Sequence, residues 1–405
     1  MESANPAPQT MQPMEGMPPT PRPDAPMKCG DGEAQKPNKV TCPTEVTKSR
    51  SPISVHINQF LLFSATSGPR GQTRVTGPGS YMLMYEKELS PRNSIRVDLM
   101  GSAEQLTVGT IGTPQLLQTE NLDAMHAHDT VMALELRDTI KLGVSGRKEL
   151  IFLFAPRGAA AVGPVPYMHR PSAEGNPDAP LGHNLQDGFH DVSTVFGAGF
   201  RTGRTFVEVT RFSGKSVSWP LPLHGPDSLG VRLTQGLTDH AEIGASYADV
   251  LTPDDNGGPS QHERFASAWL ATNHKIYGST LKSSVIWGQL RTSGGPSQNS
   301  FLAETVLQRR SDNIFGRAEL LQATPEQLAL TQTNGPKHAR WVGAVTLGYE
   351  RAVMKRGLLS LFAGTSITKD FAPRSFEGDY GRRLGGAKLF LRLKFDSATG
   401  MAPGM

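Results

Sequence analysis

Histidine and methionine side chains gather in two stretches of the chain, and both residue types can bind metals. Residues 125–129 read Met-His-Ala-His-Asp, and residues 157–190 hold a Tyr-Met-His-Arg run and two further histidines. Imidazole and thioether ligands suit Cu or Zn, and His126 and His128 point to the same side of an extended backbone, so both could reach one ion. The alternative is that these histidines hydrogen-bond loop backbones and pack the loops. The candidate ligands are His126, His128, Met168, His169, His183 and His190.

The sequence shows no comparable motif for catalysis or for nucleic-acid binding. The sequence contains no Gly-x-Ser-x-Gly nucleophile motif and no phosphate-binding glycine loop. The formal charge of +4 and the pI of about 9.0 are mild, and the basic residues are spread along the chain rather than concentrated as on a nucleic-acid-binding face. We therefore predict a non-enzyme that does not bind nucleic acid, whose positive charge attracts anionic lipopolysaccharide.

The elements that must position these side chains are β-strands. In residues 386–395 apolar residues alternate with largely charged ones and the segment closes on Phe395, as the final strand of a transmembrane barrel requires. About sixteen segments of this kind occur, each of about ten residues, the length that a tilted strand needs to cross a bilayer. They are residues 55–66, 80–89, 93–104, 130–140, 147–156, 191–201, 205–214, 229–237, 241–250, 263–272, 278–290, 300–310, 312–322, 339–353, 358–371 and 386–395.

The connections between these segments alternate short and long, which is typical of outer-membrane barrels with short periplasmic turns and long external loops. Residues 273–277 are predicted as a short turn and residues 67–79 as a long loop, and residues 157–190 form the longest loop. The sequence therefore predicts an all-β fold: an antiparallel transmembrane barrel of about sixteen strands over residues 53–396, in a Gram-negative outer membrane. A soluble β-sandwich or propeller is the alternative, since 43 Gly and 31 Pro fit any turn-rich fold.

Aromatic and charged residues distinguish the two faces of the predicted barrel. One predicted rim carries Tyr81, Tyr247, Trp287 and Trp341, and the other carries Phe200, Trp269, Tyr349 and Phe395. Charged residues of both signs take the opposite, inward phase, where they could set ion selectivity, cross-link a plugged interior or simply be solvated. The predicted lumen residues are Arg96, Asp98, Glu135, Arg137, Glu149, Glu208, Arg232, Glu242, Glu304, Arg317, Glu319, Lys388 and Arg392.

Residues 1–52 differ in composition from the rest. Pro, Gln, Lys and small polar residues dominate there, so we predict a disordered periplasmic extension, with a flexible tail at residues 397–405. Met11, Met14 and Met17 are spaced so that their thioethers could wrap a Cu(I) ion, unless this is simply a Met-rich tail.

The two cysteines and the export route bear on the compartment. Cys29 and Cys42 are the only cysteines, and in an oxidising periplasm we predict a disulfide between them, with a thiolate metal site as the alternative. Residues 1–50 contain no apolar stretch of the kind that export signals carry. Either the signal has been removed or the start is misassigned; a cytoplasmic protein is the remaining interpretation.

Three motifs carry a resemblance to a known group of proteins. His-x-His-Asp at residues 126–129, Pro-x-Met-His-Arg at 166–170, and Asn-Pro-x-Ala-Pro-x-x-His at 176–183 followed by Asp187 and His190 resemble uncharacterised Gram-negative outer-membrane barrels. Their genes are often found beside copper or other heavy-metal resistance systems. The resemblance covers residues 80–395 and implies the barrel and its compartment, and it implies metal handling by association. The chain departs from the pattern with Ala127 in place of Pro, a single histidine at residues 182–184, and the Pro-rich extension.

Two functions fit these observations. The layout resembles general porins, in which the third long loop folds inward, and this implies passive or heavy-metal (copper)-related transport with residues 157–190 as the constriction. The second function is a non-conducting scaffold whose plugged lumen supports partner-binding loops. The expected partners are lipopolysaccharide, the barrel-assembly machinery, periplasmic metal-handling proteins and further copies of the chain. No cofactor is predicted with certainty; Cu or Zn is the candidate.

Overall fold

The computed structural model describes residues 52–143, 147–214, 223–252, 260–293, 295, 297–331 and 338–397. The predictions for the amino-terminal extension, for the tail from residue 398, and for Met11, Met14, Met17, Cys29 and Cys42 lie outside these residues.

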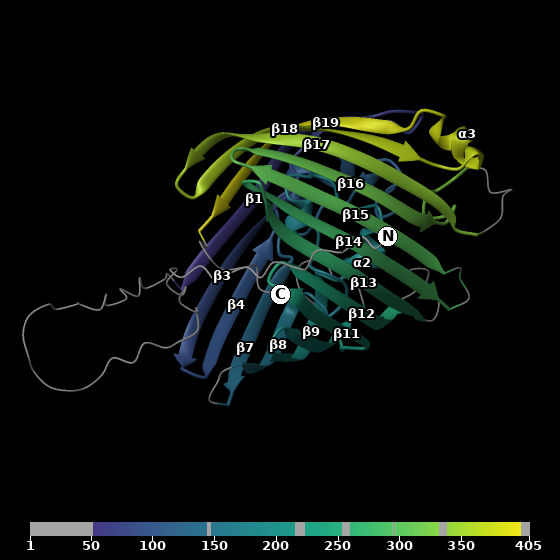
Figure 1. The fold of residues 1–405 in the computed structure, drawn as a ribbon. Coiled ribbons are helices and arrows are strands. Elements are labelled where there is room, and N and C mark those ends of the chain that lie inside the picture. The colour runs from purple at the N-terminus through teal and green to yellow at the C-terminus, as the bar shows by residue number, and fades with distance from the viewer. Residues whose placement is uncertain are drawn as a thin grey trace, which may run out of the picture. The chain divides into compact units, whose positions relative to one another are not determined.

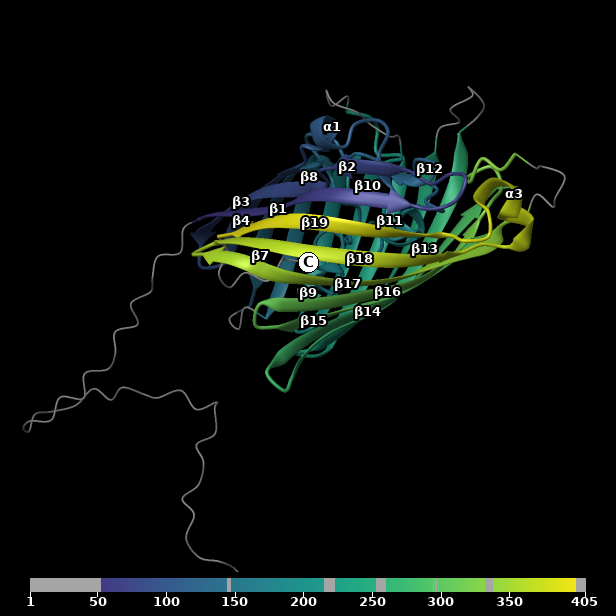
Figure 2. The ribbon, with the colours of Figure 1, turned by 90° about the horizontal axis from the view of Figure 1, so that it is seen from above.

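The described chain forms a closed antiparallel β-barrel of sixteen strands (Figures 1 and 2). The barrel closes where the first strand, β1 (Ile53–Thr66), pairs with the last, β19 (Gly385–Asp396), from His56 opposite Asp396 to Thr66 opposite Gly386. The other strands are β2 (Thr73–Thr76) with β3 (Gly79–Ser90), β4 (Asn93–Gly101), β7 (Ala133–Leu142), β8 (Lys148–Gly158), β9 (Val192–Thr202), β10 (Thr205–Ser213), β11 (Ser228–Thr238), β12 (Ala241–Thr252), β13 (Gln261–Ile276), β14 (Ser279–Thr292), β15 (Gln298–Arg309), β16 (Asp312–Ala323), β17 (Arg340–Arg356) and β18 (Leu359–Phe371).

Each predicted strand segment corresponds to one strand of the barrel, and the predicted fold class is confirmed. One predicted loop was wrong, because residues 67–79 contain β2. Strands β2 and β3 pair with successive parts of β1, so together they make one barrel strand that is interrupted at Gly77 and Pro78. Proline has no N–H to donate to the ladder, which explains the interruption.

The predicted turn at residues 273–277 was also wrong. Strand β13 continues to Ile276, and only Tyr277 and Gly278 form the turn, both with positive φ, 46° and 76°. Two positive φ values make the tight hairpin that matches the twist of the flanking strands. The sequence analysis ended the strand early because residues 273–275, Asn-His-Lys, are all polar and break the alternation. At the other end of the sheet, β4 stops at Gly101 and the short helix α1 (Glu104–Thr107) follows.

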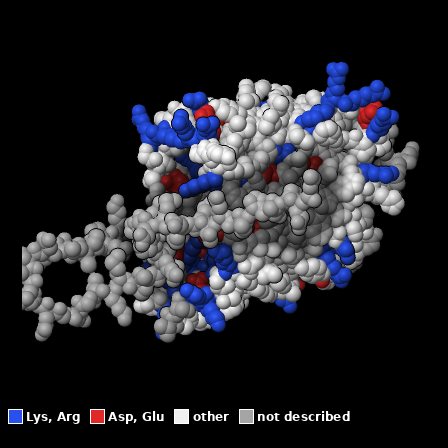
Figure 3. Space-filling model, in the orientation of Figure 1, with Lys and Arg blue, Asp and Glu red and all other residues white. Residues whose placement is uncertain are grey.

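The wall of the barrel is apolar outside and polar inside. In β19, Lys388 and Arg392 are 4% and 1% exposed, whereas Leu389 and Leu391 are 60% and 43% exposed. On the face seen in Figure 3, Lys and Arg side chains concentrate toward the two ends of the view. An apolar outer wall on a closed barrel is what lipid requires, so this is a barrel of the Gram-negative outer membrane. None of the helices in the described ranges has the length and apolar character to cross a bilayer.

Trp269 corrects the predicted aromatic rim. This side chain is 7% exposed and faces inward, in the same phase of β13 as Phe265 and Ser267. Its ring covers the backbone of its cross-strand partner Gly244, where an added Cβ would meet the ring at 2.0 Å. The glycine leaves the space that an inward tryptophan needs.

Apolar residues from the long loops form a core inside the barrel, near its long-loop end. Short elements of these loops contribute to it: β5 (Thr113–Pro114), β6 (Ala124–Met125), α2 (His183–Gln186), η1 (Pro171–Ala173), η2 (Arg374–Phe376) and α3 (Glu377–Tyr380). In Figures 1 and 2, α3 lies at the end of the barrel beside β18 and β19. The core includes Leu116, Leu117, Leu181, Leu185, Leu328, Phe376 and Tyr380.

Candidate functional site in the barrel lumen

The loop between β8 and β9, residues 159–191, lies inside the barrel; we call it the lumen loop. Its helix α2 packs against β13, β14 and β15, and its 3-10 turn η1 packs against β14 and β15. Inward hydroxyl and carboxylate groups accept hydrogen bonds from its backbone, for example Ser246 from the Gly163 N–H (2.8 Å) and Glu319 from the Leu181 N–H (2.6 Å). A backbone segment without regular structure can be buried here because the wall satisfies its polar groups.

A buried charge network fixes the middle of the lumen loop. The Arg170 guanidinium contacts Asp187 of the same loop at 2.7 Å and Glu304 of β15 at 2.5 Å. Glu304 also accepts Arg317 of β16 at 3.1 Å, and all four side chains are at most 3% exposed. Burial alone would raise the pKa of Asp187, but Arg170 and then His183 lower this pKa to about 2. The carboxylate is therefore charged at every physiological pH.

A second cluster of charges fixes the loop to the strands at the closure of the barrel. Glu174 lies 2.6 Å from Lys394, 3.0 Å from Lys282 and 3.9 Å from Arg392. Burial would raise the pKa of Glu174, but the three cations, led by Lys394, hold this pKa far below its usual range. Asp178 of the loop pairs with Lys388. We call this side of the lumen the ion-paired wall; it comprises the inward residues Lys282, Glu304, Arg317, Glu350, Lys388, Arg392 and Lys394 of β14–β19.

The remaining predicted lumen residues also face inward, but most of them pair within the wall. Arg96 contacts Asp98 at 2.8 Å, Arg137 contacts Glu135 at 2.8 Å, and Arg232 contacts Glu208 at 2.5 Å. The sequence analysis missed Glu350, whose carboxylate accepts Arg392 at 2.9 Å and is fully buried. Glu350 has the same inward phase as Ala344 and Thr346, so strict alternation along its segment could have found it. The outcome is a lumen in which nearly every cation has a carboxylate beside it.

Four of the predicted metal ligands lie together, although not around one ion. The rings of His126, His128, His190 and His183 follow one another with centroid distances of 5.1, 5.6 and 5.1 Å. Within the residues that the structure describes, no group of three or more His, Cys, Asp or Glu side chains is arranged to hold a metal ion. That His126 and His128 share an ion with His169, His183 or His190 stays a prediction.

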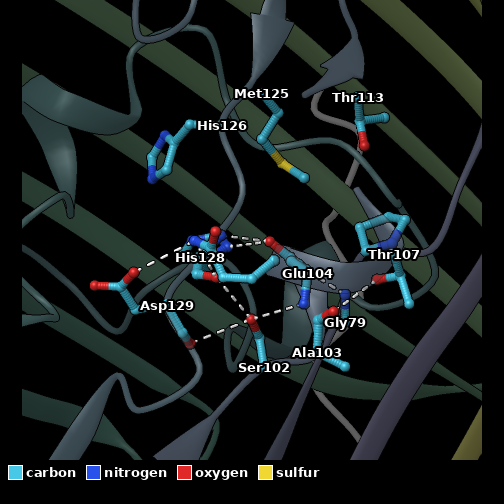
Figure 4. Close-up of polar contacts among 12 residues, drawn as sticks. Gly79, Ser102, Ala103, Glu104, Thr107, Thr113, Met125, His126, His128 and Asp129 are labelled. Atoms are coloured by element: carbon cyan, nitrogen blue, oxygen red, sulfur yellow. Dashed lines mark hydrogen bonds and ion pairs between the residues drawn. The ribbon is translucent and has the colours of Figure 1, made fainter. Parts of the chain in front are cut away.

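The four histidines brace the loops instead. The Nδ1 atoms of His126, His128 and His183 lie 2.7, 2.8 and 2.7 Å from Glu120, Glu104 and Asp187. The Glu104 carboxylate also accepts the backbone N–H groups of His128 and Gly79, so it joins three segments (Figure 4). The sequence analysis missed both Glu104 and Glu120, because nothing in their local pattern shows which loop will dock on them.

Protonation differs within this histidine cluster. Burial would lower the pKa of His126, but the hydrogen bond to Glu120 and its charge raise this pKa to about 9. Burial lowers the pKa of His190 to about 4. One ring of the cluster is thus cationic and another neutral at pH 7, which limits the repulsion within the cluster.

His169 and Met168 lie elsewhere, at the edge of a cavity of ≈ 380 Å³. The cavity includes residues near the start of β1 and the end of β19, which places it toward the short-turn end of the barrel. Its lining includes the charged pairs Arg96 with Asp98 and Arg137 with Glu135, and also a group of methionines. The lumen loop thus has one charged neighbourhood and one that is rich in sulfur.

Comparison with solved structures identifies the architecture. The chain is similar to Salmonella typhi OmpF, solved with daunomycin, with 8% identity, a TM-score of 0.55, and coverage of 85% of this chain and 97% of that one. It is also similar to an anion-selective porin from Comamonas acidovorans, with 10% identity, a TM-score of 0.51, and coverage of 85% and 98%. This is the fold of outer-membrane porins. No protein-family model matches the chain, and a search of curated proteins finds no significant match.

Proposed function

We propose that this porin-like barrel is a passive passage for small polar solutes across the outer membrane, with the lumen loop as its constriction. The observation that supports this is the fixation of the loop by buried charges beside a cavity of ≈ 380 Å³ whose lining includes charged side chains. A rigid inward loop narrows a sixteen-stranded barrel to a defined size, which such a barrel needs if it is to exclude larger solutes. The predicted association with copper resistance has no support from the porin likeness and stays a prediction.

The charges favour weak rather than strong ion selection. Most lumen cations have their own carboxylate, as in the pairs of Arg232 with Glu208 and of Arg392 with Glu350. Lys282 and Lys394 share the single carboxylate of Glu174, and this leaves a small excess of positive charge at the cavity. We expect a slight preference for anions, because a lining of one sign attracts ions of the other.

Planar-bilayer recordings of the refolded full chain test this proposal. We expect discrete conductance steps and a small reversal potential toward anions in a KCl gradient. A Glu174→Gln variant leaves Lys282 and Lys394 without their carboxylate, so the reversal potential shifts further toward anions. A Glu326→Gln variant is the matched control, because Glu326 does not line the cavity, and it keeps the wild-type potential. A barrel that is folded by circular dichroism and passes no current contradicts the proposal.

A second candidate function rests on the apolar core at the long-loop end. Leu116 and Leu181, which come from different loops, belong to this core. The loops are also linked by polar contacts: the Tyr380 hydroxyl donates to Asp123 at 2.9 Å, and Arg70 contacts the same carboxylate at 3.3 Å. Interlocked loops favour a closed barrel that presents a surface to a partner. Absence of conductance from a demonstrably folded barrel, together with an intact loop core, supports this function instead.

A further inference from the structure

Three strands bring soft metal ligands to one level of the lumen. His56 on β1 lies directly opposite Met82 on β3, and Met82 lies directly opposite Met100 on β4. All three line the cavity. Residues directly opposite on neighbouring strands have their Cβ atoms about 4.5–5.5 Å apart, so their side chains share one patch of the wall.

The lumen loop adds two further ligand types to this patch. The His169 Nε2 atom lies 3.2 Å from the Met100 sulfur. Met168 packs against a cluster that contains Met100, Met132 and, at its edge, Met82. Two imidazoles and three thioethers therefore converge from β1, β3, β4 and the loop.

The spacing suits coordination. Ligands that stand about 2.0–2.3 Å from one ion lie about 3–4 Å from each other, and the contact between His169 and Met100 falls in this range. The His56 Nδ1 atom lies 3.2 Å from Asp396, an arrangement that leaves Nε2 to face a ligand, as in carboxylate–histidine–metal triads.

Methionines also serve as ordinary gap fillers in apolar cores, so their setting decides the interpretation. Met82 and Met100 are on the inward face of a barrel in which neighbouring inward positions carry charged pairs, and they border the cavity instead of lipid. The neighbouring Met84 is different, because the Arg96 guanidinium lies 3.0 Å from its sulfur. A cation already occupies that position, so Met84 is excluded from the ligand set.

We propose that His56, Met82, Met100, Met168 and His169 form a binding site for a soft monovalent metal ion, Cu(I) or its analogue Ag(I). Thioether and neutral imidazole ligands without thiolates select Cu(I) over hard cations. The cavity provides access from the short-turn end. This site goes beyond the proposed passage of solutes and does not depend on it, since a closed barrel could hold the ion equally well.

A competition titration tests the site. The refolded full chain is titrated with Cu(I), kept reduced by ascorbate, against a chromogenic Cu(I) chelator, and Mg²⁺ serves as the hard-ion control. The amino-terminal segment carries its own soft ligands, so every protein in the series has these replaced. The background substitutions are Met11→Leu, Met14→Leu, Met17→Leu, Met27→Leu, Cys29→Ser and Cys42→Ser.

We expect one Cu(I) per barrel and no response to Mg²⁺. A Met82→Leu, Met100→Leu double variant lowers the Cu(I) affinity about tenfold or more, since even the partners of metal ligands cost about 10–100-fold when removed. A Met84→Leu, Met354→Leu double variant is the matched control and keeps the affinity. Leucine nearly conserves the volume of methionine, so both variants keep the barrel folded, which circular dichroism verifies.

X-ray absorption adds a readout that a structural role would not change. The bound Cu(I) shows both sulfur and nitrogen neighbours, and the nitrogen contribution decreases in a His169→Leu variant. The proposal is overturned if the background protein binds no Cu(I), if the Met82→Leu, Met100→Leu variant keeps full affinity, or if the control variant loses as much. Conductance plays no part in these outcomes, so they are separate from the test of the passage.

Discussion

The lumen loop contacts two sides of the barrel that hold it by different chemistry. The ion-paired wall holds Arg170 through the fully buried carboxylate of Glu304, and it holds Glu174 through the partly buried cations Lys282 and Lys394. The neighbouring contact, which we call the methionine wall, consists of His56, Met82 and Met100 on β1, β3 and β4 and touches the loop through sulfur and imidazole. Buried charges must all be matched, whereas thioethers can exchange partners at little cost. The first wall therefore fixes the loop, and the second can receive a ligand.

Breaking the ion-paired wall should have the largest effect. A Glu304→Ala substitution leaves Arg170 and Arg317 buried without their shared carboxylate, and removing one partner of a buried pair costs about 3–5 kcal/mol. We expect the free energy of unfolding in detergent, measured with urea, to fall by about that amount. Hydrogen exchange in the lumen loop should accelerate with it.

An exposed pair provides the control for this substitution. Arg204 and Asp239 pair at a short turn, where their side chains are 52% and 78% exposed. An Asp239→Ala variant should leave the unfolding midpoint nearly unchanged, because water screens the pair. If Glu304→Ala is as mild as Asp239→Ala, the buried network does not fix the loop, and the contrast between the two walls fails.

Breaking the methionine wall should have a smaller effect on stability. The Met82→Leu, Met100→Leu variant keeps the volume and apolar character of the wall, and swaps of this kind usually cost less than about 1.5 kcal/mol each. The same urea titration in the absence of metal should show this modest loss. Ag(I) should then stabilise the wild-type barrel more than the variant, because the stabilisation by a ligand falls as its affinity for the folded state falls. Equal stabilisation of both proteins contradicts a role for these two residues.

The two walls also differ in how far the sequence reveals them. Alternation along each strand predicted the barrel and the inward phase of charged residues such as Arg317 and Lys388, because lipid imposes that alternation on the outer wall. Met82 also faces inward, whereas the next residue of its strand, Leu83, faces outward. Because the side chain of Met82 is apolar, nothing in the sequence indicated that it faces the lumen. Met82 becomes a candidate ligand only through its cross-strand neighbours, and the sequence of a single strand does not show which residues those are.

Loop docking is the other part that the sequence did not reveal. Glu104 and His128 are separated by 24 residues and meet only because two loops fold into the barrel together. Arg170 and Glu304 are 134 residues apart. The histidine motif was correctly singled out as a feature of the loops, yet its carboxylate partners could be found only in the folded chain. Spacing within a motif cannot show whether a distant carboxylate will occupy one nitrogen of each ring.

The smallest predicted effect is that of acid on the folded barrel, because lowering the pH should protonate a group beside the methionine wall before it protonates one in the charge network. His169 of the lumen loop, which contacts the methionine wall, has a pKa lowered to about 4, while the pKa of Asp187 in the charge network is lowered to about 2. Both folded pKa values lie below the unfolded ones, about 6.5 and 3.8, so each contribution to stability is full at higher pH and is lost as the pH falls. The His169 contribution is lost between about pH 6.5 and 4, and that of Asp187 only between about pH 3.8 and 2.

NMR of ¹³C-methyl methionine can follow the first of these steps. We expect the methyl signals of Met100 and Met168 to shift with a midpoint near pH 4, because protonation of His169 places a cation against their sulfurs. The signal of Met354, on a strand far from this patch in the register, should stay constant and serves as the control. A His169→Leu variant should abolish the shift. A shift that persists in this variant, or that appears only near pH 2, would mean that acid acts on the ion-paired wall first and that the two walls do not release the loop independently.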